Sequence, residues 1–316
     1  MKGNALSKSA TFIFFCLGLH ALLSSEEKLD LKRILRETRL TGGFAVFVNP
    51  PDLKIATQLV QKGSFTVECL SDEPEKVLKL STFLRENGLS GKISVLPFDG
   101  RILPYVPNSV NLVILEKEAG KVSKADILRI LAPGGSVYIK AGTKWEFNTK
   151  RFPPQLDQWP LYLHDPQGTM VSRDKVVGPP KRIQWVASPK WLRNHDFMSS
   201  LNGLVSAGGR IFAIIDEGPR QHIYYPSRWC LVARDAFNGK LLWKRAIPNW
   251  WPQTWPFKSG PAFLPRRIAA TAERLYVTLG LKSPVSVLEA STGKTLSVLK
   301  QTAGTEEIVL SDGILY

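Results

Sequence analysis

The sequence predicts a two-domain fold, in which a doubly wound α/β sheet is followed by an incomplete all-β propeller of about two blades. Three observations support this division. Apolar runs alternate with helical patterns over residues 26–150, glycine turns recur over residues 180–316, and a stretch rich in tryptophan and proline, residues 151–179, lies between them. A chain of 316 residues with 44% hydrophobic and 22% charged residues has the length and composition of about two globular domains.

Residues 1–25 are predicted to be a secretory signal peptide. Lys2 and Lys8 precede the apolar run 11–23, and two serines follow that run. The run is shorter than the roughly 20 residues that a membrane-spanning helix requires. We therefore expect an exported protein (periplasmic, cell-envelope or secreted) with no transmembrane span after signal removal. The alternative is an uncleaved N-terminal membrane anchor.

Helical and strand patterns alternate over residues 26–150. The apolar run 43–48 is typical of a buried parallel strand, and the leucines and isoleucine of 29–40 have helical spacing. Further helices are predicted at 53–61, 73–87 and 123–131, and further strands at 65–70, 93–96, 110–115 and 136–140. The segment 132–135, Ala-Pro-Gly-Gly, is predicted to be the turn that closes the last helix. This alternation indicates a parallel sheet with helices on both faces.

Repeated turns organise residues 180–316. The segment 234–243 contains Asn238-Gly239 between two apolar stretches, a strong hairpin signal because both turn residues accept positive φ. A second copy follows at 289–296, and a strand pattern recurs at 209–212, 273–276 and 312–315. Such uneven spacing is expected of four-stranded blades with insertions between them. The last of these strand patterns ends with the sequence, so the chain is predicted to be truncated.

The turn pattern Asp-Ala-x-x-Gly-x-x-x-Trp resembles the repeat of quinoprotein-like (PQQ-type) propellers, in which the tryptophan docks each blade onto its neighbour. The residues that carry the resemblance are Asp235, Ala236, Gly239 and Trp243 in the first copy and Ala290 and Gly293 in the second. The quinoprotein dehydrogenases of this family use calcium, acidic catalytic residues and usually a vicinal disulfide. The chain has no Cys-Cys pair, so PQQ is not supported as a cofactor. Propellers with this repeat also serve as non-catalytic scaffolds.

Two segments of the α/β half resemble class I S-adenosylmethionine-dependent methyltransferases. Residues 99–105, Asp-Gly-Arg-Ile-Leu-Pro-Tyr, match the acidic residue before a Leu-Pro-aromatic, and residues 128–135 match the Pro-Gly-Gly turn before strand five. The resemblance implies a Rossmann-like sheet in which Asp99 meets the adenine amino group. The acidic residue that would hold the ribose falls at Ser71, with Asp72 beside it.

The glycine loop of that family is missing from this chain. Asn49, Pro51 and Leu53 occupy the positions of its three glycines. Proline offers no N–H, and the side chain of Leu53 is expected to crowd the cofactor. A degenerate domain without a cofactor is therefore predicted. If the domain is active, Asn49, Asp52, Asp72 and Asp99 are the cofactor-binding candidates. The run 49–52 resembles the Asn-Pro-Pro-aromatic motif of DNA adenine methyltransferases, but its fourth residue is an aspartate, and no sequence-specific nucleic acid is expected.

Histidine and cysteine usage adds no clear site. His164, His195 and His222 are candidates for a metal site, yet their spacing does not predict one, and no metal is expected. Cys69 and Cys230 are predicted to be two buried thiols rather than a disulfide. The segment between the two domains, called the crossover, is taken from residue 145 to residue 180 for this purpose. It is expected to be ordered because its aromatic and apolar residues require burial; these are Trp145, Phe152, Trp159, Leu161, Tyr162 and Leu163.

Two functions remain from this reading. The first is an exported, non-catalytic scaffold or binding protein that combines a degenerate methyltransferase-like domain with a propeller. The alternative is an S-adenosylmethionine-dependent methyltransferase with an atypical cofactor loop, so whether the chain is an enzyme stays open. The net charge of +15 comes from scattered basic residues and is explained first by a solvated basic surface. The expected partner of the propeller surface is an unknown protein or an anionic polymer.

Overall fold

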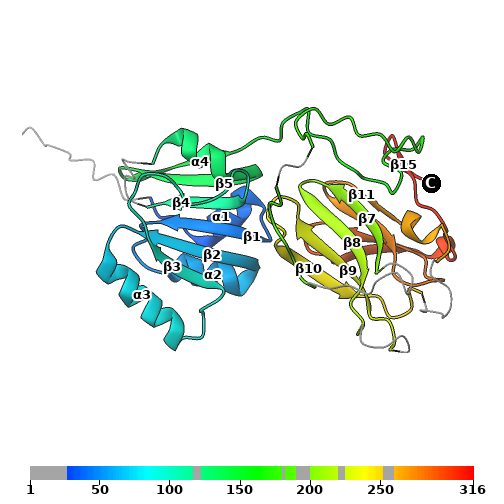
Figure 1. The fold of residues 1–316 in the computed structure, drawn as a ribbon, viewed down its shortest axis with the longest axis horizontal. Coiled ribbons are helices and arrows are strands. Elements are labelled where there is room, and N and C mark those ends of the chain that lie inside the picture. The colour runs from blue at the N-terminus through cyan, green and yellow to red at the C-terminus, as the bar shows by residue number, and fades with distance from the viewer. Residues whose placement is uncertain (1–26, 117–121, 180–181, 190–199, 220–224, 252–259) are drawn as a thin grey trace, which may run out of the picture.

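The computed structural model describes residues 27–116, 122–179, 182–189, 200–219, 225–251 and 260–316. The α/β part lies on one side of the molecule and the antiparallel sheets on the other (Figure 1). The predicted signal peptide lies outside the described residues. Within the part of the chain that is described, no helix is both long enough and apolar enough to cross a membrane.

The α/β part contains one six-stranded sheet with the order β3-β2-β1-β4-β5-β6. Its strands are β1 (Gly42–Val48), β2 (Ser64–Ser71), β3 (Ile93–Pro97), β4 (Val110–Leu115), β5 (Leu131–Ala141) and β6 (Lys144–Thr149). The first five strands in this order are parallel, and β6 pairs with β5 in the antiparallel direction. The predicted doubly wound, Rossmann-like sheet is confirmed, because helices cover both of its faces.

The two faces of this sheet are covered unequally. Three helices pack on one face, namely α1 (Leu31–Thr38), α2 (Lys54–Lys62) and α3 (Pro74–Glu86). Only α4 (Lys124–Ile130) packs on the other, where Leu103 from the loop after β3 completes the apolar layer. Alternate residues of β1 supply both layers: Ala45 and Phe47 face the three helices, and Val46 faces α4.

The end of the α/β part differs from the prediction. Residues 132–135 are not a free turn but belong to β5, which begins directly after α4 at Leu131. The strand accommodates the Pro-Gly-Gly segment through a shift of register, with Val110 opposite Leu131 and Leu112 opposite Ser136. The sequence also gave no indication of β6. Trp145, which was placed in the crossover, lies in that strand and is buried.

The described residues between 201 and 315 form two four-stranded antiparallel sheets and a hairpin, which together are called the β domain. The first sheet contains β7 (Leu201–Ala207), β8 (Arg210–Asp216), β9 (Trp229–Asp235) and β10 (Leu241–Ala246). The second contains β11 (Ile268–Ala270), β12 (Arg274–Thr278), β13 (Val285–Glu289) and β14 (Thr295–Leu299), and the hairpin joins β15 (Leu310–Ser311) to β16 (Ile314–Leu315). One apolar core is shared between the sheets, with Phe212 and Leu231 from the first and Leu275 and Leu288 from the second. The strand order fits blade-like units, but no closed propeller is present in the described residues.

The two repeated turns differ in detail from the expected Asn-Gly hairpin. Only the glycine takes a positive φ, 71° at both Gly239 and Gly293. At the first turn, Asp235 Oδ1 accepts hydrogen bonds from the N–H groups of Phe237 and Asn238. The aspartate side chain therefore closes the turn, and Asn238 does not need the left-handed conformation.

The crossover is held between the two β-sheets over part of its length. Trp159 pairs with Ser206 of β7, and Leu161 pairs with Ala269 of β11. Leu161 is buried, whereas Phe152 and Tyr162 are exposed. The expectation that all the aromatic residues of the crossover are buried is therefore wrong. Backbone pairing, rather than aromatic burial alone, orders this segment.

Both cysteines expected to remain after signal removal are buried and free. Burial raises the pKa of Cys69 and of Cys230 to about 12. The prediction of two buried thiols is confirmed.

The β domain docks on the amino edge of the parallel sheet, where β1, β2 and β4 begin. Ser64 Oγ at the start of β2 donates a hydrogen bond to the carbonyl oxygen of Leu241, at 2.5 Å. Thr41 Oγ1, just before β1, donates to the carbonyl oxygen of Ser291 at 2.8 Å. Among the described residues, the opposite, carboxyl edge of the sheet carries none of these contacts with the antiparallel sheets.

Candidate functional site

The carboxyl edge of the parallel sheet is the first candidate site. β1 lies between β2 and β4, so the strand order reverses there. In open α/β sheets, ligands bind outside the carboxyl ends of the strands at such a switch point. The loops that leave this edge begin with Asn49 after β1, Asp72 after β2, Phe98 after β3 and Glu116 after β4.

Asn49 keeps the backbone conformation that a glycine would adopt. Its φ is 50°, in the left-handed region that asparagine tolerates better than most residues. Its N–H donates to the carbonyl oxygen of Leu70 at 2.7 Å, and its Oδ1 accepts from the N–H of Asp72 at 3.1 Å. Asn49 therefore preserves the sharp exit from β1 and ties it to the exit from β2.

Leu53 does not crowd the carboxyl edge. Its side chain is 4% exposed and belongs to the core between the sheet and the three helices. The expectation that it would occupy ligand space is wrong, because the start of α2 turns the side chain inward. Pro50 is buried and Pro51 is exposed, so the missing N–H of Pro51 is the departure that still weakens the loop. The Asp52 carboxylate accepts from the N–H of Lys54 at 2.8 Å in the turn before α2.

Two exposed carboxylates follow neighbouring strands at this edge. Asp72 follows β2, and none of the hydrogen bonds between described residues involves its carboxylate. Asp99 follows β3 and accepts a turn hydrogen bond from the N–H of Arg101 at 3.0 Å. Ser71 is buried, and its hydroxyl accepts from the N–H of Glu73. Asp72, rather than Ser71, is thus the side chain that a ligand can reach after β2.

The loop that carries Asp99 is anchored on α4. Asp126 accepts a hydrogen bond from the N–H of Leu103, and Arg129 donates to the carbonyl oxygens of Leu103 and Tyr105. The Tyr105 hydroxyl donates to Glu68 of β2 at 2.6 Å. Burial together with this carboxylate raises the pKa of Tyr105. These contacts fix the loop from its far end and hold Asp99 at the sheet edge.

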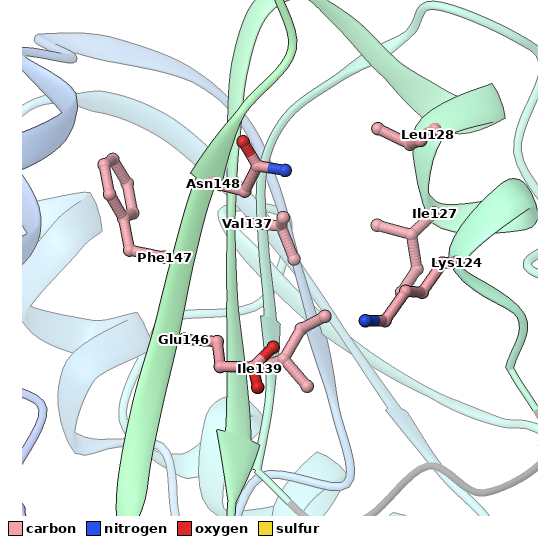
Figure 2. A pocket seen from close by; sticks show the side chains of 8 residues that line it. All are labelled: Lys124, Ile127, Leu128, Val137, Ile139, Glu146, Phe147 and Asn148. Atoms are coloured by element: carbon pink, nitrogen blue, oxygen red, sulfur yellow. The ribbon is translucent and has the colours of Figure 1, made fainter.

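A cleft of about 410 Å³ opens between α4 and the β5–β6 hairpin (Figure 2). Ile127 and Leu128 of α4 face Val137 and Ile139 of β5 across it, while the ends of Lys124 and Glu146 lie near Ile139. The cleft exists because β5 turns back directly into β6, so no crossover helix covers this part of the sheet. It offers an apolar wall with one cation and one carboxylate, and it adjoins the carboxyl half of β5.

His164 is part of a buried clamp within the crossover. Its Nε2 lies 2.8 Å from Asp157 Oδ2, and its Nδ1 lies 3.5 Å from Asp165 Oδ2. Burial raises the pKa of Asp157, but the N–H of Arg173 and the His164 ring outweigh it, and the pKa is about 2. The Thr169 hydroxyl and N–H hold the pKa of Asp165 at about 2 as well.

No cluster of three or more metal-ligating side chains occurs in the described part of the chain. His195 and His222, the other two weak metal candidates, lie outside it. The contacts of His164 with two aspartates indicate that this residue has a structural role in the crossover.

The repeat residues form two equivalent tryptophan contacts. The indole N–H of Trp243 donates to the carbonyl oxygen of Ala290 at 2.9 Å, and its ring covers Gly293, where an added Cβ would lie 2.6 Å from the ring. Trp185 makes the same contacts one turn earlier: its N–H donates to the Ala236 carbonyl oxygen, and an added Cβ on Gly239 would lie 2.3 Å from its ring. Sequence reasoning missed Trp185, although its distance from the first turn resembles that of Trp243 from the second.

The domain interface contains a buried polar network that the sequence did not reveal. Asn111 of β4 donates to Asp235 Oδ2 at 2.7 Å and accepts from Asn238 Nδ2 at 2.8 Å and from the N–H of Phe44 at 2.8 Å. Gly43 is required beside it, because its φ is 135° and an added Cβ would lie 2.4 Å from Asn111 Oδ1. Burial raises the pKa of Asp235, although its hydrogen bonds oppose this. Asp235, predicted only as a repeat residue, therefore also joins the two domains.

No protein-family model matches the chain, and no curated protein matches it. The α/β part is similar to solved structures of methyltransferases. One is a putative S-adenosyl-L-methionine-dependent methyltransferase from Methanococcus maripaludis, with 18% identity over 35% of this chain and 53% of that one, and a TM-score of 0.32.

Two further similar structures are a putative sarcosine dimethylglycine methyltransferase from Galdieria sulphuraria and a SAM-dependent methyltransferase from Aquifex aeolicus. The first has 18% identity, covers 34% of this chain and 43% of that one, and has a TM-score of 0.31. The second has 16% identity, covers 34% of this chain and 61% of that one, and has a TM-score of 0.30. The chain spans about half the length of the first of these solved structures.

Proposed function

We propose that the carboxyl edge of the α/β sheet binds S-adenosylmethionine and that the chain is a methyltransferase with an atypical cofactor loop. The observation that supports this most is the pair of exposed carboxylates, Asp72 and Asp99, at the ends of neighbouring strands beside the switch point. Asp72 would accept hydrogen bonds from the ribose hydroxyls and Asp99 from the adenine amino group. When bound, S-adenosylmethionine supplies an activated methyl group.

The loop after β1 fits this ligand better than its sequence indicates. Asn49 retains a positive φ, and Leu53 points into the core, so two of the three lost glycines leave the backbone path and the ligand space intact. Pro51 remains unfavourable because it offers no N–H. We therefore expect weaker binding than a glycine loop would give, and Pro51→Gly should strengthen it.

The cleft between α4 and the β5–β6 hairpin is the proposed site for the methyl acceptor. It adjoins the carboxyl half of β5, and its apolar wall with Lys124 and Glu146 fits an amphipathic molecule that carries a charged group. The acceptor would thus approach from the α4 face, while the cofactor lies across the strand ends.

Calorimetric titration of the full chain with S-adenosylmethionine tests the cofactor proposal. Asp72→Asn should weaken binding about 10-fold or more, since a hydrogen bond to a charged group contributes about 1.5–3 kcal/mol. Glu86→Gln on α3 is the matched control and should leave the affinity unchanged. The absence of heat and of thermal stabilisation at millimolar ligand, both in the parent and in Pro51→Gly, would overturn the proposal.

A second candidate function is that of a non-catalytic binding protein that uses the antiparallel sheets. The contact of Trp243 favours it, because it joins the first antiparallel sheet to the turn of the second, as the quinoprotein-like resemblance implies, and Trp185 makes the equivalent contact on the first turn. Loss of S-adenosylmethionine binding, together with capture of a defined partner by the β domain, would favour this candidate. The proposal of export is separate, and a fusion of residues 1–40 to a reporter that is active only outside the cytoplasm tests it.

A further inference from the structure

A groove runs between the two domains on the side of the sheet opposite to the proposed cofactor edge. One part, of about 460 Å³, is lined by the ends of α1 and α2, the start of β2, the start of β10 and the second repeat turn. A second part, of about 210 Å³, reaches inward to Asn111, Arg210 and Asp235. The two parts adjoin because they share four lining residues, Arg39, Leu40, Thr41 and Leu242. We call this space the interdomain groove.

The charges that line the interdomain groove are mostly positive. Arg39 and Lys62 are exposed to it, and no ion pair joins either of them to a carboxylate of the described residues. Arg210 lies at the inner end, where burial lowers its pKa and where its guanidinium meets only the backbone carbonyl oxygens of Gly208 and Ala272 among the described hydrogen bonds. Unpaired cations around one concave space attract an anion.

The carboxylates nearest to the groove are already engaged. Asp235 is buried and accepts hydrogen bonds from Asn111 and from its own turn. Glu289 accepts from the hydroxyl of Thr292, which lines the groove, but Glu289 itself does not line it. The partly buried Trp243 adds aromatic surface on the outer part, where Phe65 is buried. The lining thus combines free cations with aromatic surface, while the hydroxyl groups of Thr41, Ser64 and Thr292 already donate within the protein.

We propose that the interdomain groove binds a small molecule that carries a tetrahedral oxyanion, that is, a phosphate or sulfate ester. Arg39 and Lys62 hold the oxyanion, Thr41 lies beside them, and the aromatic surface accepts the uncharged part of the ligand. Because the groove is formed by both domains, the ligand stabilises their docking. This site does not depend on the proposed cofactor site, which lies at the other edge of the sheet.

Calorimetric titration of the full chain with pyrophosphate and with sulfate at low ionic strength tests this site. We expect saturable binding of at least one probe in the millimolar range or tighter, weakened by added salt. The probe that binds more tightly distinguishes a phosphate from a sulfate ligand. S-adenosylmethionine, which carries neither group, should not displace it.

Variants separate an anion site from a purely structural role of the two cations. Arg39→Gln and Lys62→Gln should each weaken pyrophosphate or sulfate binding about tenfold, and the double variant should abolish it. Arg36→Gln on α1 and Lys54→Gln on α2 are matched controls outside the groove and should bind like the parent. If the double variant folds by circular dichroism and retains the parent's affinity, or if neither probe binds the parent at about 10 mM, the proposal is wrong.

Discussion

The two edges of the parallel sheet differ in what they contact. At the amino edge, the starts of β1, β2 and β4 donate and accept hydrogen bonds across the domain interface, and Asn111 and Asp235 are buried there. At the carboxyl edge, the strands end in loops with exposed Asp72, Asp99 and Pro51. The amino end of the sheet therefore buries polar groups that hold the two domains together, whereas the carboxyl end exposes its polar groups.

This difference between the two edges predicts which substitutions lower stability and which do not. A polar group that loses its partner in the interior costs much more free energy than an exposed group that can turn to water. Substitutions of the buried polar groups at the amino edge should thus act on folding, whereas substitutions of exposed groups, at the carboxyl edge or around the interdomain groove, should act on binding. The predictions below test this contrast, beginning with the largest expected effect.

Asn111→Leu should lower the free energy of unfolding by about 3–5 kcal/mol. The change leaves Asp235 Oδ2 buried without its donor, and it removes one acceptor of Asn238 Nδ2 and the acceptor of the N–H of Phe44. Urea unfolding of the full chain measures it. The matched change at the other edge, Asn49→Gly, should cost less than about 1 kcal/mol, because it removes one exposed hydrogen bond and relieves a positive φ. Similar losses at the two edges would contradict the contrast.

Gly293→Ala should cost about 2–4 kcal/mol, since it combines backbone strain with displacement of the Trp243 ring. Gly304→Ala measures the cost of backbone strain alone, because the φ of Gly304 is 83° and an added Cβ meets nothing within 4 Å. That control should lose only about 1 kcal/mol. Thermal unfolding followed by tryptophan fluorescence compares the two. Equal losses would show that the tryptophan contact contributes nothing.

Acid should weaken the contacts of His164 with Asp157 and Asp165 in the crossover. It should not weaken the network around Asp235 at the domain interface. The pKa values of Asp157 and Asp165 are about 2 in the folded chain, below the ordinary 3.8, so their contribution is present above about pH 4 and is lost as the pH falls toward 2. The pKa of Asp235 is raised instead, so its ionisation costs stability as the pH rises above 3.8.

Stability curves between pH 2 and 5, with Asp157→Asn as the comparison variant, test these opposite signs. The variant should lose less stability than the parent on acidification, since one of the two depressed pKa values is removed. A steeper acid loss in the variant would mean that Asp157 is not stabilised in its charged form.

Asp72→Asn should change the free energy of unfolding by no more than about 0.5 kcal/mol, because the side chain is exposed and the described contacts give its carboxylate no partner. The same variant is expected to weaken S-adenosylmethionine binding. Denaturant unfolding run beside the binding titration separates the two effects. A large loss of stability would show that Asp72 has a structural role, and it would contradict its assignment to ligand binding.

The sequence by itself determined the elements that depend on local pattern. The strand predicted at 110–115 has those bounds in the structure, the predicted helices and strands of residues 29–115 lie within a few residues of the observed ones, and the turns at Gly239 and Gly293 join the last two strands of each sheet. Apolar periodicity and glycine turns are encoded within a few neighbouring residues, so no knowledge of distant contacts was required. The prediction of two buried thiols rested instead on the positions of Cys69 and Cys230 in different parts of the chain.

Only the tertiary structure decided which side chains face a ligand and which face a partner domain. Asn111 and Asp235 are 124 positions apart, and Trp185 finds its turn 51 positions later. Neither contact leaves a local pattern. Leu53 was expected to crowd the loop because the sequence gives its position but not the direction of its side chain. Residues 144–149 form β6 because the edge of β5 was free to pair. The direction of a side chain and the pairing of a strand depend on which surfaces the rest of the chain leaves exposed. Those surfaces are defined only by the tertiary packing.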